Sequence, residues 1–379
     1  MEKYSAFRDP GTGIQPFLTP VPPIGNDLPV KILLPVGYVF GAIRALVLLA
    51  VSLASFVLVR VALLVTVPVP ALHRILRRIF VAIFARTALF LSGIVWIPVE
   101  IAPRKRTKLQ SKGGWTPAAG DIIVSNWVSW LEVLWLAFRF DPQFVLPIAD
   151  APVVAASKDA TPITSTPGRR TGTGSAAISS SFRAPTPKAT IRGWTRVSLL
   201  TMLRQTGLTP PYALQQSPHI HSLDDIRRSS NRPIVVFPEC TTSNGRGLLR
   251  FADVFKDTVT ELPVRGWNVW VMCVRYDPPT AFHPTLSRSI PSNTTLNPLP
   301  HVLSLVTSLV PLTSSIRLLP ASESPNSRSF LQSEVLPGRV DDKLSEACAA
   351  LIAQVGKMKR VGMGWEDKAA FLELYNSKR

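Results

Sequence analysis

Two long apolar stretches dominate the first hundred residues of the chain. Residues 32–67 are almost continuously apolar, and residues 45–59 carry no charge. A helix that crosses a bilayer requires about 20 apolar residues. This stretch therefore predicts a membrane helix, provided that Arg44 and Arg60 reach the interfaces or face a partner.

The second apolar stretch covers residues 79–97, contains Arg86 and follows a basic turn at residues 73–78. Two apolar helices joined in this way are typical of a transmembrane pair or of a hairpin embedded in one leaflet. In either case the basic turn favours the lipid headgroups on the cytoplasmic side. The alternative is a pair of buried core helices in a soluble protein.

Short β-type runs alternate with helical segments in the rest of the chain, which predicts an α/β layered fold. The expected strands lie at residues 121–126, 143–149, 233–239, 268–276 and 315–320. The expected helices lie at residues 131–140, 197–205, 341–360 and 365–377.

The pattern divides the chain into four parts. Residues 1–31 are polar and proline-rich, which predicts a disordered tail and argues against a cleaved secretory signal. The membrane-embedded helices occupy residues 32–100, the globular domain 101–340 and the C-terminal helices 341–379. Within the globular domain, residues 151–190 are rich in Ser, Thr, Pro and Gly, which predicts a disordered insertion.

The charge balance narrows the class of partner. The 42 Lys and Arg residues outnumber the 24 Asp and Glu residues, giving a net charge of +18. Such a charge suits an anionic partner, and the neighbouring apolar runs favour a phospholipid membrane over nucleic acid. The cysteines, Cys240, Cys273 and Cys348, have no metal-ligand spacing, which argues against a zinc site or disulfide framework and for a reducing compartment.

Polar residues follow two of the expected strands. The sequence SNWVSWLE (125–132) comes after the first strand, and VVFPECTTSNGRGLLRF (235–251) contains the end of a later one. Strand-end loops of α/β folds commonly bind ligands, because side chains and free backbone groups converge there.

Together the two stretches resemble the glycerolipid acyltransferase family, which carries an Asn-His-x-x-x-x-Asp motif and a later Phe-Pro-Glu-Gly-Thr motif. Asn126 matches the first Asn, Glu132 stands at the position of the Asp, and Ser129 lies between them. In the later motif, residues 237–239 and Thr241 match four of the five family residues.

A divergent fungal branch of this family, lysophosphatidic acid:oleoyl-CoA acyltransferases linked to vacuolar protein sorting, shows a more specific resemblance. There the later motif continues as Thr-Ser-Asn-Gly-Arg-Gly, as it does here at residues 242–247. The sequence KMKRVGMGWEDKAAF (357–371) is also similar to that branch. The resemblance covers roughly residues 100–376.

The resemblance implies a glycerol-3-phosphate acyltransferase-like layered sheet, preceded by the membrane helix pair. It implies acyl transfer from acyl-CoA, as co-substrate, to a lysophospholipid, most simply lysophosphatidic acid to phosphatidic acid. No metal and no bound cofactor are expected. The expected location is the endoplasmic reticulum membrane or a lipid droplet, with the active domain facing the cytoplasm. The implied catalytic residues are Asn126, Ser129 and Glu132, and the implied substrate-binding residues are Arg196, Glu239, Cys240, Thr241, Asn244 and Arg246.

The arginines come from two separate considerations, and Arg250 is a further candidate beside Arg196 and Arg246. A Gly followed by an Arg that contacts the substrate phosphate forms a middle motif in the family, and Gly193 with Arg196 is the candidate here. Arg246 and Arg250 are added because guanidinium groups match phosphate oxygens. Each of these arginines is equally compatible with a solvated surface position.

The chain departs from the family at two positions, with Trp127 in place of the catalytic histidine and Cys240 in place of glycine. The indole nitrogen only donates hydrogen bonds, so Trp127 cannot accept a proton from the acceptor hydroxyl. Glu132 is one replacement for the base, because a carboxyl beside Trp127 and Trp130 has its pKa raised by desolvation.

Three alternatives to a Glu132 base remain open. His219 or His221, which precede a later strand, could be brought in by the fold. Glu132 could have only a structural role, since an acidic residue in a first helical turn interacts favourably with the helix dipole. Finally, the site could bind lipid or acyl-CoA without turnover, which predicts an inactive acyltransferase-fold protein in lipid binding or membrane trafficking.

Overall fold

The structure is a computed structural model of the chain. It describes residues 4–23, 28–104, 114–152, 185–212, 220–293, 295–336, 338 and 340–377, without the side chains of residues 28–31, 60 and 62.

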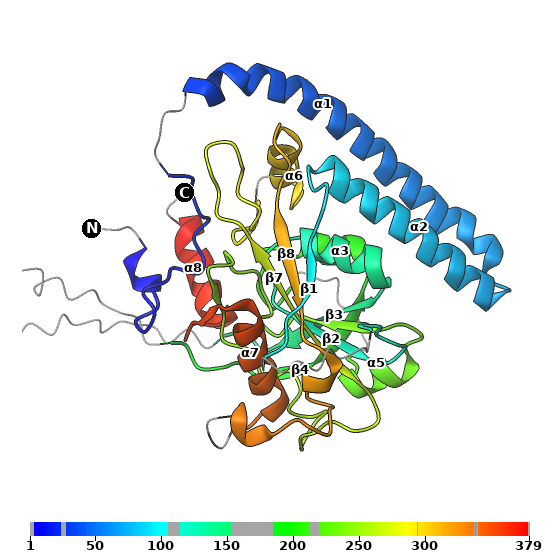
Figure 1. Cartoon of the computed structure of the whole chain (residues 1–379), viewed down its shortest axis with the longest axis vertical. Coiled ribbons are helices and arrows are strands. Elements are labelled where there is room, and N and C mark those ends of the chain that lie inside the picture. The colour runs from blue at the N-terminus through cyan, green and yellow to red at the C-terminus, as the bar shows by residue number, and fades with distance from the viewer. Residues whose placement is uncertain are drawn as a thin grey trace, which may run out of the picture.

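A seven-stranded sheet, with strand order β1-β8-β7-β2-β5-β3-β4, forms the centre of the molecule (Figure 1). The strands are β1 (Val99–Ile101), β2 (Ile122–Ser125), β3 (Gln143–Ala149), β4 (Ile191–Val197), β5 (Ile234–Val236), β7 (Val269–Tyr276) and β8 (Ser314–Leu318). The central strands β7, β2, β5 and β3 are parallel, while β4 and β8 run antiparallel to their neighbours β3 and β7. A separate short pair consists of β6 (Gly247–Leu248) and β9 (Lys359–Arg360).

Helices cover both faces of the sheet, because residues alternate between two apolar cores along each strand. On β2, for example, Ile122 and Val124 belong to one core and Ile123 to the other. The first core includes α5 (Leu223–Ser229) and α7 (Lys343–Gly356). The second core includes α2 (Pro70–Leu91), α3 (Leu131–Phe140), α4 (Leu199–Arg204) and α6 (Leu299–Val306).

The alternation predicted from the sequence is confirmed. Each of the five expected strands is present, and the four expected helices correspond to α3, α4, α7 and α8 (Trp365–Ser377). The prediction missed β1, β4, α5 and α6, as well as the short pair β6 and β9. In the main sheet the missed strands β1 and β4 lie at the two edges, where half-exposed sequences such as IRGWTRV in β4 give a weak apolar signal.

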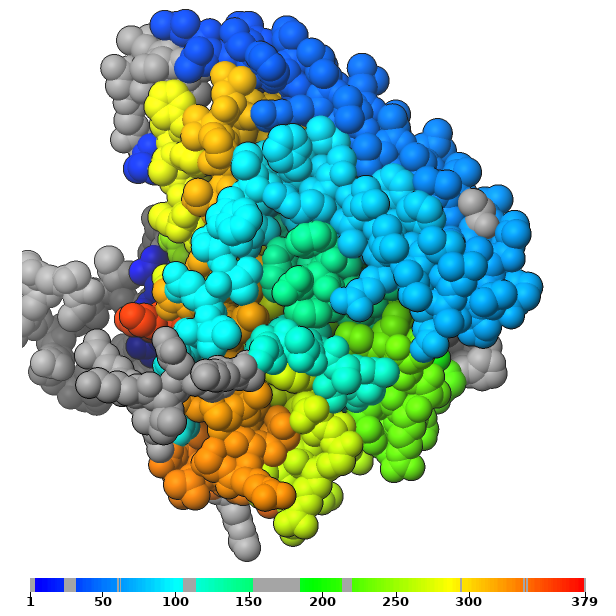
Figure 2. Space-filling view, turned by 45° about the vertical axis from the view of Figure 1, so that its right-hand side comes forward, coloured from blue at the N-terminus to red at the C-terminus, as the bar shows by residue number. Residues whose placement is uncertain are grey.

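One segment is long and apolar enough to cross a membrane or to act as a signal sequence. It runs from Ile32 to Thr66 and comprises most of α1 (Leu28–Phe56), a π-helical turn (Val57–Val61) and a 3₁₀ turn (Ala62–Thr66). Its large apolar side chains are mostly exposed. Figure 2 shows this helix as a long ridge on the outside of the molecule.

Arg44 attaches α1 to the globular domain. Its guanidinium donates hydrogen bonds to the carbonyl oxygens of Val306, at 3.3 Å, and Ser308, at 2.6 Å, at the end of α6. Close approach at this contact requires glycine, because a Cβ at Gly41 would lie 2.6 Å from a Thr307 methyl carbon. Arg44 therefore contacts another part of the same chain. This corresponds to the alternative in which the arginine faces a partner.

The second apolar segment differs from the expected membrane helix. Helix α2 begins earlier than predicted, at Pro70, and packs one side (Val81, Ala85 and Leu89) into the core beside α3. Its other side exposes Ile75, Ile79, Ile83 and Phe90. Within the described residues, the apolar criterion for spanning is met by the first segment alone.

The N-terminal segment (residues 4–23) also differs from the disordered tail that its composition predicts. Phe7 and Phe17 are buried, and both rings contact Phe371 of α8. Asp9 accepts a hydrogen bond from the Gly362 backbone N–H at 2.8 Å. Aromatic residues spaced through a proline-rich stretch provide this packing without regular secondary structure.

The predicted insertion at residues 151–190 is only partly covered by the structure. Residues 153–184 lie outside the described residues. Residues 185–190, however, are packed beside α8, where Thr186 donates hydrogen bonds from its backbone N–H and hydroxyl to Asp367.

Candidate functional site

The two motifs meet where the adjacent parallel strands β2 and β5 end. Asn126 immediately follows β2 and is clamped to β7, because its side chain both accepts from the Val274 N–H, at 2.8 Å, and donates to the Val274 carbonyl oxygen, at 2.9 Å. The parallel order β7-β2-β5 brings the carboxyl ends of the three strands to the same edge of the sheet. Asn126 thus fixes the first motif in register with its neighbour.

Glu239 links the two motifs directly. Its Oε2 accepts from the backbone N–H of Trp127 at 2.6 Å, and its Oε1 accepts from the backbone N–H of Leu249 at 2.8 Å. The side chain is fully buried. Glu239 therefore holds the loop after β2 and the loop after β5 together, which gives it a structural task at the centre of the site.

The Glu132 side chain accepts hydrogen bonds from the loop that precedes α3 and from β7. Its Oε1 accepts from the backbone N–H groups of Val128 and of Ser129, the latter at 2.6 Å. Its Oε2 accepts from the hydroxyl of Tyr276. Glu132 lies in the first turn of α3, so the acidic residue that favours the helix dipole and the possible base are the same residue.

Burial shifts both carboxyl groups toward the protonated form. Desolvation raises the pKa of Glu132 to about 7, although the hydrogen bonds from Tyr276 and the backbone counteract the shift. Desolvation also raises the pKa of Glu239 to about 8, with a smaller contribution from the nearby charge of Glu132. A carboxyl with a pKa near 7 can exchange protons at cellular pH.

Trp127, which stands where the resembled motif has a histidine, is a packed ring. It is fully buried and stacks on Phe237 of the second motif, with ring centroids 5.1 Å apart. Its Nε1 donates to the carbonyl oxygen of Ser129 at 3.1 Å. The indole thus provides a contact that joins the two motifs.

Cys240 adopts a backbone conformation that favours glycine, the residue that the resembled motif has at this position. Its φ is 53°, in the left-handed region, and its side chain is buried in the core. The hydroxyl of Tyr212 donates to its carbonyl oxygen. Burial raises the pKa of the thiol well above its usual value, so the group is a thiol and not a reactive thiolate.

Substitutions of Cys240 should separate backbone strain from packing. Glycine relieves the left-handed strain but loses buried side-chain contacts, so we expect Cys240→Gly to change stability by no more than ~1 kcal/mol. Cys240→Val places a β-branched residue in this conformation and should cost at least ~2 kcal/mol. Thermal unfolding of the detergent-solubilised variants measures both effects. Equal stability of the Gly and Val variants would contradict the conformational role.

Lys368 on α8 is a site residue that sequence reasoning missed. Its ammonium donates to Thr241 Oγ1 and to the Thr242 carbonyl oxygen, both at 2.7 Å. The side chain is fully buried, and desolvation lowers its pKa well below the usual value, while the charge of Glu239 opposes the shift. The similarity of residues 357–371 to the fungal branch was the available signal for this residue, because the stretch contains Lys368.

Removing the ammonium of Lys368 should loosen the second motif. Lys368→Met keeps much of the volume but leaves the Thr242 carbonyl oxygen without this donor, and we expect a loss of ~1–3 kcal/mol. Lys357→Met, on the same C-terminal region, is a control for loss of one positive charge. Chemical unfolding monitored by circular dichroism compares the two. A Lys368 variant as stable as the control would refute the bridging role.

Two segments cover the motifs from outside. The N-terminal segment accepts hydrogen bonds from the Asn244 side chain, through the carbonyl oxygens of Gln15 at 2.6 Å and Leu18 at 2.9 Å. The crossing loop (residues 279–292) lies over both motifs, because Arg288 donates its backbone N–H to Val128 and accepts from the Thr242 hydroxyl. The candidate catalytic side chains are consequently at most 1% exposed.

The arginines expected at the acceptor phosphate are not gathered here. Arg196 lies on β4, the edge strand, and is hydrogen-bonded to Ser229 of α5. Arg246 follows the second motif and is exposed. Arg250 bridges Glu366 and the carbonyl oxygen of Thr186, a structural contact.

Neither histidine proposed as a replacement base is shown at the two motifs. His219 lies outside the described residues, and His221 pairs its backbone with Trp194 of β4. A different histidine, His301 on α6, accepts from the indole N–H of Trp130 at 2.9 Å. Burial lowers its pKa to about 4, and its Nε2 donates to the Thr285 carbonyl oxygen, so the ring is neutral and both nitrogens are engaged.

Ser129 retains one unused polar group. Its hydroxyl oxygen is buried and has no hydrogen-bond partner within the described ranges. The same parts of the chain contain no group of three or more His, Cys, Asp or Glu residues that could hold a metal ion.

Comparisons of the chain with protein-family models, curated proteins and solved structures give no match.

Proposed function

We propose that this chain is a membrane-bound acyltransferase that transfers a fatty acyl group from acyl-CoA to a lysophospholipid, with lysophosphatidic acid as the simplest acceptor. The observation that carries the proposal is the convergence of the two family-like motifs through Glu239 and Trp127 at one edge of the sheet. Beside this junction lies Glu132, whose pKa of about 7 suits proton transfer at neutral pH.

In the proposed reaction the acceptor hydroxyl attacks the thioester carbonyl carbon. Its proton passes to the Glu132 carboxylate, the new C–O ester bond forms, and the C–S bond breaks. The carboxyl then returns the proton to the departing CoA thiolate, so that atoms and charges balance. Tyr276 holds Glu132 Oε2 through its hydroxyl, and the unengaged Ser129 hydroxyl is available to the reacting groups.

The arrangement of α1 and α2 supports action at a membrane surface. The exposed apolar side chains of α1 continue onto the outer side of α2, where basic residues such as Arg74 and Arg78 flank them. This combination of apolar and basic groups suits an anionic phospholipid surface. The proposed location is the endoplasmic reticulum or a lipid droplet, with the sheet on the cytoplasmic side.

Substrate access requires movement of a covering segment, because the candidate catalytic side chains are buried. The N-terminal segment is suited to this, since it lies on the second motif through Asn244 and leads along the chain into the membrane helix. In the proposal, seating α1 in a bilayer withdraws this segment from the motif. The acyl chain and headgroup would then enter from the membrane side.

A second candidate function is favoured by the packed indole of Trp127. A site whose histidine position is filled by a ring stacked on Phe237, and whose carboxylates accept backbone hydrogen bonds, can be stable without catalysis. The chain would then be an inactive acyltransferase-fold protein that binds lipid or acts in membrane trafficking.

Turnover by the wild type separates the two functions, and Trp127→His adds a second readout, when both are assayed in membranes that lack endogenous acyltransferase, with labelled oleoyl-CoA and lysophosphatidic acid. If the chain is an enzyme, the wild type forms labelled product, and Trp127→His changes the pH dependence of the acyl-transfer rate. For the inactive protein, the wild type shows no turnover above empty membranes. Trp127→Phe is the matched control, because it keeps an aromatic ring and adds no base. The thermal stability of Trp127→Phe also shows how much stability is lost when the indole packing is removed.

A further inference from the structure

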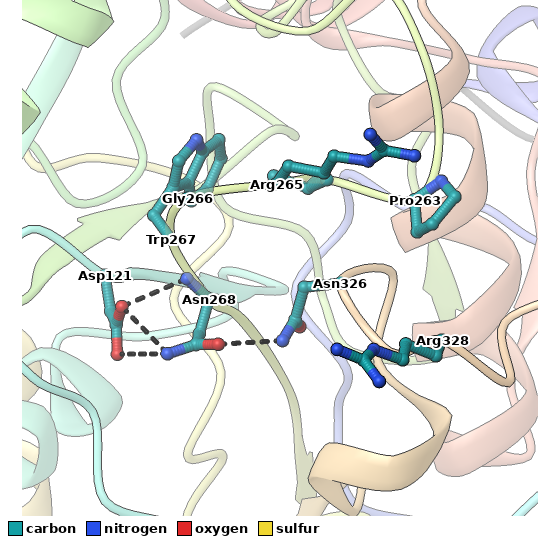
Figure 3. Close-up of a pocket in the computed structure, with 9 residues that line it drawn as sticks. Asp121, Pro263, Arg265, Gly266, Trp267, Asn268, Asn326 and Arg328 are labelled. Atoms are coloured by element: carbon teal, nitrogen blue, oxygen red, sulfur yellow. Dashed lines mark hydrogen bonds between the residues drawn. The ribbon is translucent and has the colours of Figure 1, made fainter.

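The amino ends of β2 and β7, opposite to the candidate active site, border an open hollow of about 820 Å³ (Figure 3). The loop at residues 263–268 lines one side, and Asn326 and Arg328 line the other. The two loops are joined by the hydrogen bond from the Val264 N–H to the Pro325 carbonyl oxygen, at 3.0 Å. The hollow therefore has fixed walls.

Its floor is a rigid chain of polar groups. Asp121 is buried and accepts from the Asn268 side chain, at 3.2 Å, and from the indole N–H of Trp270, at 2.9 Å. The Asn268 side-chain oxygen in turn accepts from Asn326 Nδ2 at 2.8 Å. The one carboxylate among the lining residues is thus occupied by donors.

Two guanidinium groups supply the charge of the hollow. Arg265 and Arg328 both line it and are exposed, and neither makes an ion pair with the described part of the chain. Other basic residues nearby are neutralised, as Arg227 is by Asp224. Two available guanidinium forks across one hollow match the oxygens of a phosphate chain.

A flat aromatic group completes the lining. The indole of Trp267 borders the hollow, and the guanidinium of Arg227 lies over its ring, 5.3 Å from the centroid. This cation–π contact fixes the ring orientation. A fixed indole beside an amide is suited to a planar heterocycle, because the ring stacks while the second N–H of the Asn326 amide, whose first N–H is bonded to Asn268, offers a hydrogen bond to its edge.

We propose that this hollow is a binding site for a soluble nucleotide, with its phosphates on Arg265 and Arg328 and its base against Trp267. Its position favours a soluble ligand over a lipid headgroup. The loops that form it lie at the end of the molecule away from α1, the segment that would meet the membrane (Figures 1 and 2). The site does not depend on acyl transfer.

Calorimetric titration of the full-length protein in detergent micelles tests the site, with ADP, pyrophosphate and glycerol 3-phosphate as probes. We expect Arg265→Gln and Arg328→Gln each to weaken ADP and pyrophosphate binding about tenfold or more, because each removes a charge-assisted contact. Trp267→Leu should weaken ADP but leave pyrophosphate unchanged. Arg204→Gln, an exposed arginine on α4, controls for the loss of one positive charge.

Three results would overturn the proposal. The first is the absence of ADP binding by the wild type at millimolar concentration. The second is an Arg204→Gln effect as large as that of the two hollow variants, which would assign the binding to general attraction by the basic surface. The third is tighter binding of glycerol 3-phosphate than of ADP, which would assign the hollow to a lipid headgroup. Both arginines are exposed, so their variants should fold normally.

Discussion

Glu239→Gln is expected to destabilise the fold strongly. At pH 5 the Glu239 carboxyl is protonated, because its pKa is about 8, and each of its oxygens keeps a lone pair that accepts a backbone N–H from a different loop. An amide keeps only its carbonyl oxygen as an acceptor and turns its own N–H₂ toward the other N–H. Leaving a buried donor unpaired costs ~1–3 kcal/mol, and the two loops lose their common anchor. Chemical unfolding of the solubilised protein at pH 5 measures the loss.

Glu132→Gln is the matched comparison and should be tolerated better. Its carbonyl oxygen can keep the backbone N–H groups of Val128 and Ser129, while the amide N–H₂ can donate to Tyr276 once that hydroxyl rotates. Equal losses in the two variants would contradict the assignment of Glu239 as the link between the motifs.

The loss caused by Glu239→Gln should depend on pH. The folded-state pKa of Glu239 is raised from 4.5 to about 8, so the folded protein holds this proton more tightly than the unfolded chain. The stability linked to that proton is fully present below the unfolded-state pKa and is lost as pH rises to about 8. The difference in free energy of unfolding between the wild type and Glu239→Gln should therefore become smaller between pH 5 and pH 8.

The activity of Glu132→Gln is the second large expected effect. If Glu132 is the base, its removal should lower kcat about 100-fold or more, because a general base typically contributes 10²–10⁴-fold. The wild-type rate should rise with pH through about 7, the pKa of Glu132, since the ionised carboxylate accepts the proton. The variant should lose this limb of the pH profile while remaining folded.

Tyr276→Phe adds a readout that a purely structural role would not produce. The Tyr276 hydroxyl lowers the pKa of Glu132 by donating to its carboxylate. Without that hydrogen bond the limb of the pH profile should move to higher pH. Measurement of kcat/KM between pH 5.5 and 9 shows the shift, and an unchanged limb would refute Glu132 as the titrating group.

The α/β alternation could be predicted from the sequence because the central strands are short apolar runs with polar loops between them. The residues around Asn126 and Glu239 were identifiable for a related reason, since each follows such a run directly. Periodicity indicates where a strand ends, and parallel strands bring their ends together.

Contacts between segments distant in the chain could not be predicted. Lys368 reaches Thr241 from 127 residues away, and Tyr276 reaches Glu132 from 144 residues away. The packing of Phe17 on Phe371 is of the same kind, and composition alone indicated a disordered tail. These contacts depend on tertiary packing, which leaves no local periodicity in the sequence.

Turnover by the wild-type chain, measured with labelled oleoyl-CoA and lysophosphatidic acid in membranes that lack endogenous acyltransferase, tests the proposed function most directly. The account predicts labelled phosphatidic acid above the level of empty membranes, rising with pH through about 7 and lost in Glu132→Gln. A wild-type chain that is folded and membrane-bound but forms no labelled product would contradict it.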